Sequence, residues 1–344
     1  MKTLAGVPVV DRAGTRLVEH RFDGRPWPVA QPVTFTPFAS VRPCSARCVF
    51  CSETLWHKDA RILSASLRPG PSYFDGLAAV LDALRGLPFG ISLSGLEATD
   101  DADWLCRVLD QIDERAGAAG GLVLEEKVLY SNGAGLARET TGARLLPRLK
   151  EFGLTRVEAS RHHHTKAGND AVMRFRPGKA IRALEVFERT VADILRHVPV
   201  RLVCVVQKGG VDDFDQVLRY LDWARGLGAR DVVFREFSRL HDLYRPGASR
   251  RAIDERRIPV SALRDAASES ADFEAVERTE GYYYWNERFL WKGAVLTTFE
   301  ASDYELMKTR HGSWVIHKLI YHANGNLCGD WDPEKSVVMR GGGR

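Results

Sequence analysis

Three cysteines lie within eight residues, in the segment Cys44-Ser-Ala-Arg-Cys48-Val-Phe-Cys51. Thiolates spaced in this way can ligate three irons on one face of a [4Fe–4S] cluster, which leaves the fourth iron open to a bidentate ligand. A structural zinc site is the alternative, but zinc takes four ligands, usually from paired Cys-x2-Cys knuckles. The chain has no second knuckle, and the nearest fourth candidate is His57. The spacing therefore favours an iron–sulfur cluster.

The cysteine segment follows the first of six short β-branched runs that alternate with helical patterns. The expected strands are 33–41, 89–94, 122–130, 155–160, 200–206 and 231–235. The expected helices lie near 72–86, 101–116, 136–151, 177–196 and 212–227. This alternation predicts parallel βα units, whose ligand-binding loops follow the carboxyl ends of the strands. Periodicity alone leaves a barrel and an open sheet as alternatives.

The two ends of the chain differ from this middle part. Residues 1–32 are rich in Pro, Gly and charge, and we expect an irregular lead-in. Residues 238–279 are charged and are expected to be mostly helical or irregular. Aromatic and β-branched runs within 281–330 suggest strands, and Asn324-Gly325 is a hairpin signal. The expected organisation is therefore a lead-in (1–32), an α/β body (33–240) and a C-terminal extension (241–344).

Composition limits the class of protein. A hydrophobic content of 44% and a charged content of 27% are ordinary for a soluble globular chain. The formal net charge of +4 is too small for a nucleic-acid-binding face. No apolar run approaches the roughly 20 residues that cross a bilayer, and the N-terminus does not read as a signal peptide. We expect a cytoplasmic protein with no nucleic-acid or membrane partner, in which clustered cysteines bind metal.

Over roughly residues 33–240 the chain resembles the radical S-adenosylmethionine (SAM) superfamily. The cysteine triplet, with Phe50 before its last cysteine, is the most specific part of the resemblance. Ser94-Gly-Leu-Glu97 is similar to the family's Gly-Gly-Glu segment, although Leu96 replaces the second glycine. Tyr130–Gly133 and Val157–Arg161 resemble the segments after the third and fourth strands. The fifth strand with its loop, and the sixth strand, resemble the molybdenum-cofactor cyclase and SPASM-related branch.

The resemblance implies a partial (β/α)6 TIM-like barrel with a C-terminal α+β extension. It also implies a [4Fe–4S] cluster on Cys44, Cys48 and Cys51, and SAM as the ligand of the open iron. By the same resemblance, the Glu97 carboxylate accepts from the methionyl ammonium of SAM. The further SAM-binding candidates are Asn132, Ser160 and Arg161. The alternative for each is ordinary, since a serine at a strand end is usually a turn residue and an exposed glutamate is usually solvated.

The remaining cysteines differ in their surroundings. Cys106 and Cys204 are expected to pack as small hydrophobic residues. Cys328 lies in a polar turn that resembles the start of auxiliary-cluster domains, but no cysteine follows it, so a second cluster is not expected. A lone thiol placed there could return a hydrogen atom to a substrate radical, as in several radical SAM epimerases. A buried structural cysteine is the alternative.

Two further features bear on the substrate. The run His162–His164 could form a substrate-contacting loop or a solvated one. The second half of the chain carries many aromatic and acidic residues, a combination that suits sugars and aminosugars. We therefore expect a small, carbohydrate-like substrate that is epimerised with Cys328 as the hydrogen-atom donor.

Other outcomes stay open. Radical dehydrogenation, decarboxylation or another rearrangement of a small polar substrate is the first alternative. A cluster-bearing binding or sensing module is the alternative of another class. The expected protein partner of the enzyme is an electron donor such as flavodoxin or ferredoxin.

Overall fold

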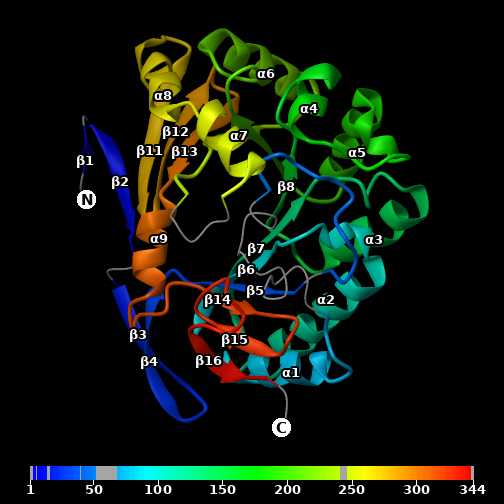
Figure 1. The fold of residues 1–344 in the computed structure, drawn as a ribbon, viewed down its shortest axis with the longest axis vertical. Coiled ribbons are helices and arrows are strands. Elements are labelled where there is room, and N and C mark those ends of the chain that lie inside the picture. Colours follow the sequence, from blue (N-terminus) through cyan, green and yellow to red (C-terminus); the bar gives the residue numbers. More distant parts are fainter. Residues whose placement is uncertain are drawn as a thin grey trace.

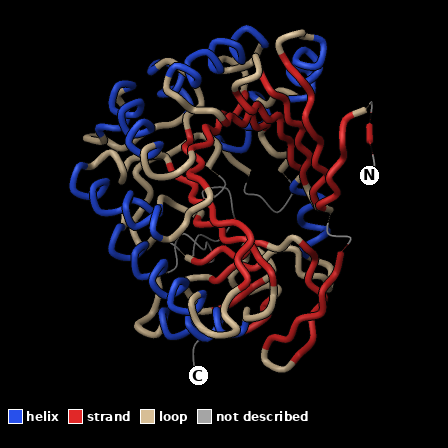
Figure 2. The backbone as a smooth tube through the Cα atoms, turned by 180° about the vertical axis from the view of Figure 1, so that it is seen from behind, coloured by secondary structure: helices blue, strands red, loops and turns tan. Residues whose placement is uncertain are grey.

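The computed structural model describes residues 3–4, 6–13, 16–38, 40–51, 68–240 and 246–341. Fourteen strands of this part form one continuous sheet, and two more form a separate hairpin. Figures 1 and 2 show the sheet curving through a wide arc, with most helices on its outer side. This curvature turns one face of the sheet towards the helices and the other towards an interior.

Six parallel strands make the body of the sheet, and each pairs with the next one along the chain. They are β5 (Thr34–Pro37), β6 (Pro88–Leu93), β7 (Val123–Ser131), β8 (Arg156–Ser160), β9 (Val200–Val206) and β10 (Asp231–Glu236). All six correspond to strands expected from the sequence. The expected α/β fold class, a partial (β/α)6 barrel, is confirmed.

Helices connect these strands along the outer face. They are α1 (Tyr73–Ala83), α2 (Ala102–Ala116), α3 (Glu139–Glu151), α4 (Lys166–Val172), α5 (Leu184–Leu195) and α6 (Phe214–Gly226). Side chains cap the first turns of α2 and α6: Asp101 accepts from the backbone N–H of Trp104, and Asp213 accepts from that of Gln216. Five of the six helices were expected from the sequence, and α4 was not.

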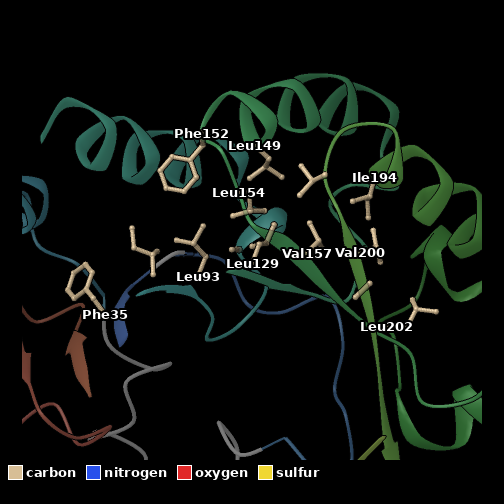
Figure 3. Packing of buried hydrophobic residues seen from close by; sticks show 14 of the residues in the cluster. Phe35, Leu93, Leu129, Leu149, Phe152, Leu154, Val157, Ile194, Val200 and Leu202 are labelled. Atoms are coloured by element: carbon tan, nitrogen blue, oxygen red, sulfur yellow. The ribbon is translucent and has the colours of Figure 1, made fainter. Parts of the chain in front are cut away.

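The main core lies between the parallel strands and this helical layer. Figure 3 shows Leu93, Leu129, Val157 and Leu202 of the strands facing helix side chains such as Leu149. These residues are fully buried. Because strand side chains alternate, Glu158 and Ser160 of β8 lie on the opposite, interior face from Val157. The sheet thus keeps its apolar face for the helices and its polar face for the interior.

The C-terminal region extends the same sheet at both ends. Its elements are α7 (Ala248–Arg256), α8 (Val260–Glu269), β11 (Phe273–Gly281), β12 (Tyr284–Trp291), β13 (Val295–Ser302), α9 (Tyr304–His311), β14 (Leu319–Tyr321), β15 (Asn326–Cys328) and β16 (Val337–Arg340). Strand β13 pairs parallel to β10, and β14 pairs parallel to β5. The expected hairpin at Asn324-Gly325 joins β14 to β15. Residues 238–279, expected to be mostly helical or irregular, hold α7 and α8 and the first part of β11.

The N-terminal region is not the irregular lead-in that we expected. It forms β1 (Thr3–Leu4), β2 (Val7–Arg12), β3 (Arg16–Phe22) and β4 (Arg25–Gln31). Strand β2 joins the large sheet beside β11, while β3 and β4 form the separate hairpin. Asp23 and Gly24, with φ of 48° and 75°, form the turn of this hairpin, and Asp-Gly is a preferred pair for such a turn. Because of its prolines, β4 was not expected to be a strand, but an edge strand tolerates proline.

Within the part of the chain that the structure describes, no helix combines the length and the apolar character needed to cross a membrane.

Candidate functional site

The cysteine loop follows β5 and is tied to the chain after β8. The backbone N–H groups of Arg47 and Val49 donate to the carbonyl oxygens of Arg174 (2.7 Å) and Val172 (3.2 Å). Arg176 adds its side chain, whose Nε donates to the Cys44 carbonyl oxygen at 2.8 Å. These contacts hold the loop at the carboxyl ends of the parallel strands, as expected for a ligand-binding loop.

The three thiols lie close enough to influence one another. All three are partly buried, and the Cys51 N–H donates to the Cys48 carbonyl oxygen at 3.2 Å. Burial, and next the Glu97 carboxylate, raise the pKa of Cys44 to about 12. Burial, and next Cys51 and Cys44, raise the pKa of Cys48 far above its usual range. Bound cations reverse this situation, because a thiol that ligates a metal is deprotonated.

This donor set fits an iron–sulfur cluster. Among the described residues, no three His, Cys, Asp or Glu side chains converge tightly enough to hold one ion, and His57, the fourth candidate for a zinc site, lies outside the described residues. The ligands of a [4Fe–4S] cluster need not converge, because each binds a different iron. Three thiols on one loop could therefore ligate three irons and leave one open.

Glu97 lies buried beside this loop, directly after β6. Its Oε1 accepts from Ser131 Oγ (2.8 Å) and Thr99 Oγ1 (2.5 Å), and its Oε2 accepts from the Asn132 N–H (2.6 Å). Burial raises the pKa of Glu97, while the hydrogen bonds from Thr99, Asn132 and Ser131 act in the opposite direction. Through these hydrogen bonds, the Glu97 carboxylate connects the segment after β6 to the carboxyl end of β7, next to the cysteine loop.

The turn before Glu97 contains an unusual backbone conformation. Gly95 and Leu96 have φ of 86° and 55°, so both lie in the left-handed region. A leucine there costs about 1–2 kcal/mol, which a glycine would avoid. The turn keeps the left-handed conformation although Leu96 is not a glycine, and it directs Glu97 inward. Local strain of this kind is commonly retained at functional sites.

Asn132 connects Glu97 to the cysteine loop. Its Nδ2 donates to Ser45 Oγ at 3.1 Å and lies 3.6 Å from Cys44 Sγ. Asp100 fixes the same loop, because its Oδ2 accepts from the Ser45 N–H at 2.8 Å. The structure thus brings Cys44, Glu97 and Asn132 together. Asn132, expected to bind SAM, contacts the loop that carries the thiols.

Ser160 and Arg161 lie on opposite faces of the sheet. Ser160 ends β8 on the interior face, partly exposed, with no side-chain hydrogen bond in the described part of the chain. Arg161 is buried on the helix side, where its guanidinium carbon lies 4.8 Å from the ring centroid of Phe187 and 5.9 Å from that of Trp223. Ser160 can therefore reach a ligand in the interior. Arg161 is not brought together with Glu97.

His162, the first residue of the histidine run, is buried and packs on the cysteine loop. Its Nδ1 accepts from the Val205 N–H at 3.0 Å, so Nε2 carries the proton. The Phe50 ring lies edge-on to the imidazole, with 4.8 Å between the centroids. Burial lowers the pKa of His162 to about 3, so the ring is neutral. The ring of Phe50, next to Cys51, thus packs on a neutral imidazole.

The interior face of the sheet carries a network of charges. Arg235 Nε donates to Glu300 Oε1 at 2.6 Å. Glu158, which is buried, accepts from Arg156 at 3.0 Å and from Arg201 at 3.4 Å. These residues come from β8, β9, β10 and β13. This part of the interior face is thus polar and charged.

The three other cysteines take no part in this network. Cys204 is fully buried in the core, as expected, and Cys106 packs at the edge of the core on α2. Cys328 is also fully buried, and its Sγ lies 3.7 Å from the Pro333 carbonyl oxygen. By its pairing with Ile320, Cys328 faces away from the core that holds Leu319 and Tyr321, under the segment 329–336. The thiol is therefore covered by its own hairpin loop.

Lys318, just before β14, is in an unusual environment. Its Nζ lies 4.5 Å from the ring centroid of Trp331. Burial lowers the pKa of Lys318 from 10.5 to about 8, although Asp330 acts in the opposite direction. At a pH between these two pKa values, Lys318 is mostly protonated in the unfolded chain and mostly deprotonated in the folded chain. The lysine therefore makes the free energy of unfolding rise with pH in this window.

We expect Lys318→Met to flatten that rise. The measurement is denaturant unfolding of both proteins at several pH values from about 7.5 to 11, a range that includes the pKa of Lys318 in the folded chain and in the unfolded chain. Thiols and tyrosines titrate equally in both proteins, so the difference isolates Lys318. An identical pH dependence in the two proteins would show that the lysine stays charged in the folded chain.

No protein-family model matches the chain, and no curated protein sequence does. Among solved structures, Streptococcus suis SuiB bound to precursor peptide SuiA is similar, with a TM-score of 0.50 and 14% identity over 89% of this chain and 64% of SuiB. The protein anSMEcpe with bound AdoMet and Cp18Cys peptide has a TM-score of 0.45 and 14% identity, over 63% of this chain and 54% of anSMEcpe. TYW1 with a lysine-pyruvate adduct bound has a TM-score of 0.39 and 15% identity, over 70% of this chain and 74% of TYW1. At these identities, the likeness to SuiB shows a shared fold. The chain spans less than two thirds of the length of SuiB and of anSMEcpe.

Proposed function

We propose that this chain, which has the fold of the radical SAM enzymes, binds a [4Fe–4S] cluster and SAM and removes a hydrogen atom from a polar substrate. One observation carries the proposal: the cysteine loop and the buried Glu97 carboxylate are joined through Asn132, whose Nδ2 lies 3.6 Å from Cys44 Sγ. When bound, the cluster supplies the electron that cleaves SAM into methionine and a 5′-deoxyadenosyl radical. The electron would come from a protein such as flavodoxin or ferredoxin.

The chain's own residues would hold and orient these groups. Cys44, Cys48 and Cys51 would ligate three irons and leave one open. Glu97 would accept from the methionyl ammonium through Oε2, which takes one hydrogen bond within the described chain while Oε1 takes three. Ser160 could donate to the ribose or carboxylate from the interior face, and Arg161 would have to leave its place between the helices to do so.

The interior charges support a substrate with both donors and acceptors. Arg235 and Glu300, from neighbouring strands, would meet its polar groups near the carboxyl ends of the strands. A carbohydrate or aminosugar meets this requirement. We propose hydrogen return, and thus epimerisation, as the outcome. Cys328 is the donor expected from the sequence, and it can act only where the 329–336 segment moves off its buried thiol.

Cleavage of SAM is the test of this function. Anaerobically reconstituted protein, reduced with dithionite, is expected to convert SAM into 5′-deoxyadenosine, measured by liquid chromatography with mass detection. A binding or sensing module would keep its cluster and leave SAM intact. Reconstituted protein that holds iron but forms no 5′-deoxyadenosine would therefore exclude the enzyme and favour that alternative.

A further inference from the structure

A tyrosine, a histidine and an aspartate from three segments meet beside the C-terminal strands. Tyr282, in the turn between β11 and β12, has its hydroxyl 3.2 Å from Nε2 of His311, the last residue of α9. On the other side of the imidazole, Asp330 Oδ1 lies 3.5 Å from Nδ1. That distance is an ion-pair contact rather than a good hydrogen bond. The aspartate thus acts on His311 through its negative charge.

His311 is enclosed between the two other members of this group. His311 is 5% exposed, and its Nδ1 has no hydrogen-bond partner in the described chain. An imidazole whose two nitrogens face a hydroxyl and a carboxylate is placed to relay a proton, a common role of histidine. The ring of His317 stacks on Tyr282 at 5.0 Å, and Lys318 and Arg310 are the nearby basic groups. Tyr282 can therefore exchange its phenolic proton with His311 inside the protein.

Packed side chains, most of them aromatic, connect Tyr282 to the cysteine loop. Tyr282 and Tyr283 lie 4.7 Å apart, and Tyr283 and Tyr304 lie 6.2 Å apart, between ring centroids. Tyr304 packs on the small cluster of Val205, Phe237 and Ile253, on which Phe50 of the cysteine loop also packs. The partly exposed Tyr282 therefore lies on the side of the barrel where the proposed chemistry takes place.

We propose that Tyr282 is a hydrogen-atom donor to a carbon-centred radical, with His311, held by Asp330, as the relay through which its hydroxyl is restored. The proposal rests on the function proposed above and assigns the donor role to Tyr282 instead of Cys328. A phenolic O–H bond is weaker than the C–H bond of a carbinol, so the transfer runs downhill. Tyr282 is half-buried, whereas Cys328 is fully buried under its own loop.

The proposed step balances in atoms and electrons. The O–H bond of Tyr282 breaks, a C–H bond forms on the radical carbon, and a neutral tyrosyl radical remains. One electron from the flavodoxin- or ferredoxin-type donor then reduces the tyrosyl radical, and one proton from solvent, relayed through the His311 imidazole, restores the phenol. Asp330 contacts the other ring nitrogen of His311 and keeps the imidazole facing the phenol.

The first arm of the test needs neither cluster nor SAM. The full-length chain is oxidised by one electron with a photoexcited ruthenium tris-bipyridine complex and a sacrificial acceptor, and tyrosyl radical is counted by EPR. We expect the radical yield to fall in Tyr282→Phe and in His311→Phe. It should be unchanged in Tyr284→Phe, because Tyr284 is half-buried with no imidazole partner within the described chain. Equal yields in all four proteins would overturn the proposal.

The second arm uses the reconstituted protein with SAM alone in deuterated water. We expect deuterium in the 5′-deoxyadenosine of the wild type and of Cys328→Ala, and its loss in Tyr282→Phe. Label lost in Cys328→Ala but kept in Tyr282→Phe would overturn the proposal and return the donor role to the cysteine. Unlabelled 5′-deoxyadenosine from the wild type would also overturn it. If the wild type forms no 5′-deoxyadenosine, the proposed function is wrong, and the donor role of Tyr282, which depends on it, is wrong as well.

Discussion

Replacing Cys44, Cys48 or Cys51 with alanine is expected to abolish both the iron content and the cleavage of SAM. The wild type should bind about four irons and four sulfides after reconstitution, since three thiolates suffice to hold the cluster. Loss of one ligand leaves two, and the partly buried loop offers no other thiol among the residues that the structure describes. Iron and sulfide are measured by colorimetric assay beside the absorbance of the cluster.

Cys106→Ala is the matched control for this experiment. Cys106 is also a partly buried free thiol, but it lies on α2 and packs at the edge of the core. Its variant should keep the iron, the sulfide and the activity of the wild type. A triple variant of the loop cysteines that retained its iron would show that the cluster, if any, is bound elsewhere.

Glu97→Gln is expected to weaken SAM binding while leaving the cluster in place. The substitution replaces one carboxylate oxygen by an amide NH2 group, which is a hydrogen-bond donor. That donor must face either the methionyl ammonium or the groups of Ser131, Thr99 and Asn132 that donate to Glu97, and neither contact is favourable. A charge-assisted hydrogen bond contributes about 1.5–3 kcal/mol, so affinity should fall roughly tenfold to a hundredfold. Equilibrium dialysis of SAM against the reconstituted protein measures this loss.

Glu236→Gln separates loss of affinity from loss of stability. Glu236 is a buried carboxylate that accepts from the Val260 N–H at 2.8 Å and pairs with Arg257, on the outer side of β10. Its variant should lose stability, as Glu97→Gln does, but keep the wild-type affinity for SAM. Unchanged affinity in Glu97→Gln would mean that Ser94–Glu97 holds the cysteine loop without touching SAM.

The parallel body of the fold could be predicted because its strands and helices are local patterns. Each strand of β5–β10 is a short β-branched run, and the helices between them show clear apolar faces. The proximity of Cys44 and Glu97 could be predicted from this pattern, since both follow parallel strands and parallel strands bring their carboxyl ends to one edge. Elements paired over long sequence distances were harder. Strand β2 joins β11, and nothing local in 1–32 indicates this partner.

The site was predicted less completely than the fold, for reasons visible in single side chains. Arg161 shares its strand face with Val157, so alternation along β8 already pointed it towards the helices. The His162 contacts depend on Val205, which lies 43 residues away. The Tyr282–His311–Asp330 group joins three segments that no spacing connects. Side-chain meetings of this kind require the tertiary structure.

The most direct test of the central claim is the EPR spectrum of the reduced cluster with and without SAM. Three cysteine ligands and one open iron predict that SAM binds the cluster itself, so its addition should shift the g values of the wild type. Glu97→Gln should need more SAM to produce the same shift. A reduced cluster whose spectrum is the same with and without saturating SAM would have no open iron, and this would contradict the proposed function.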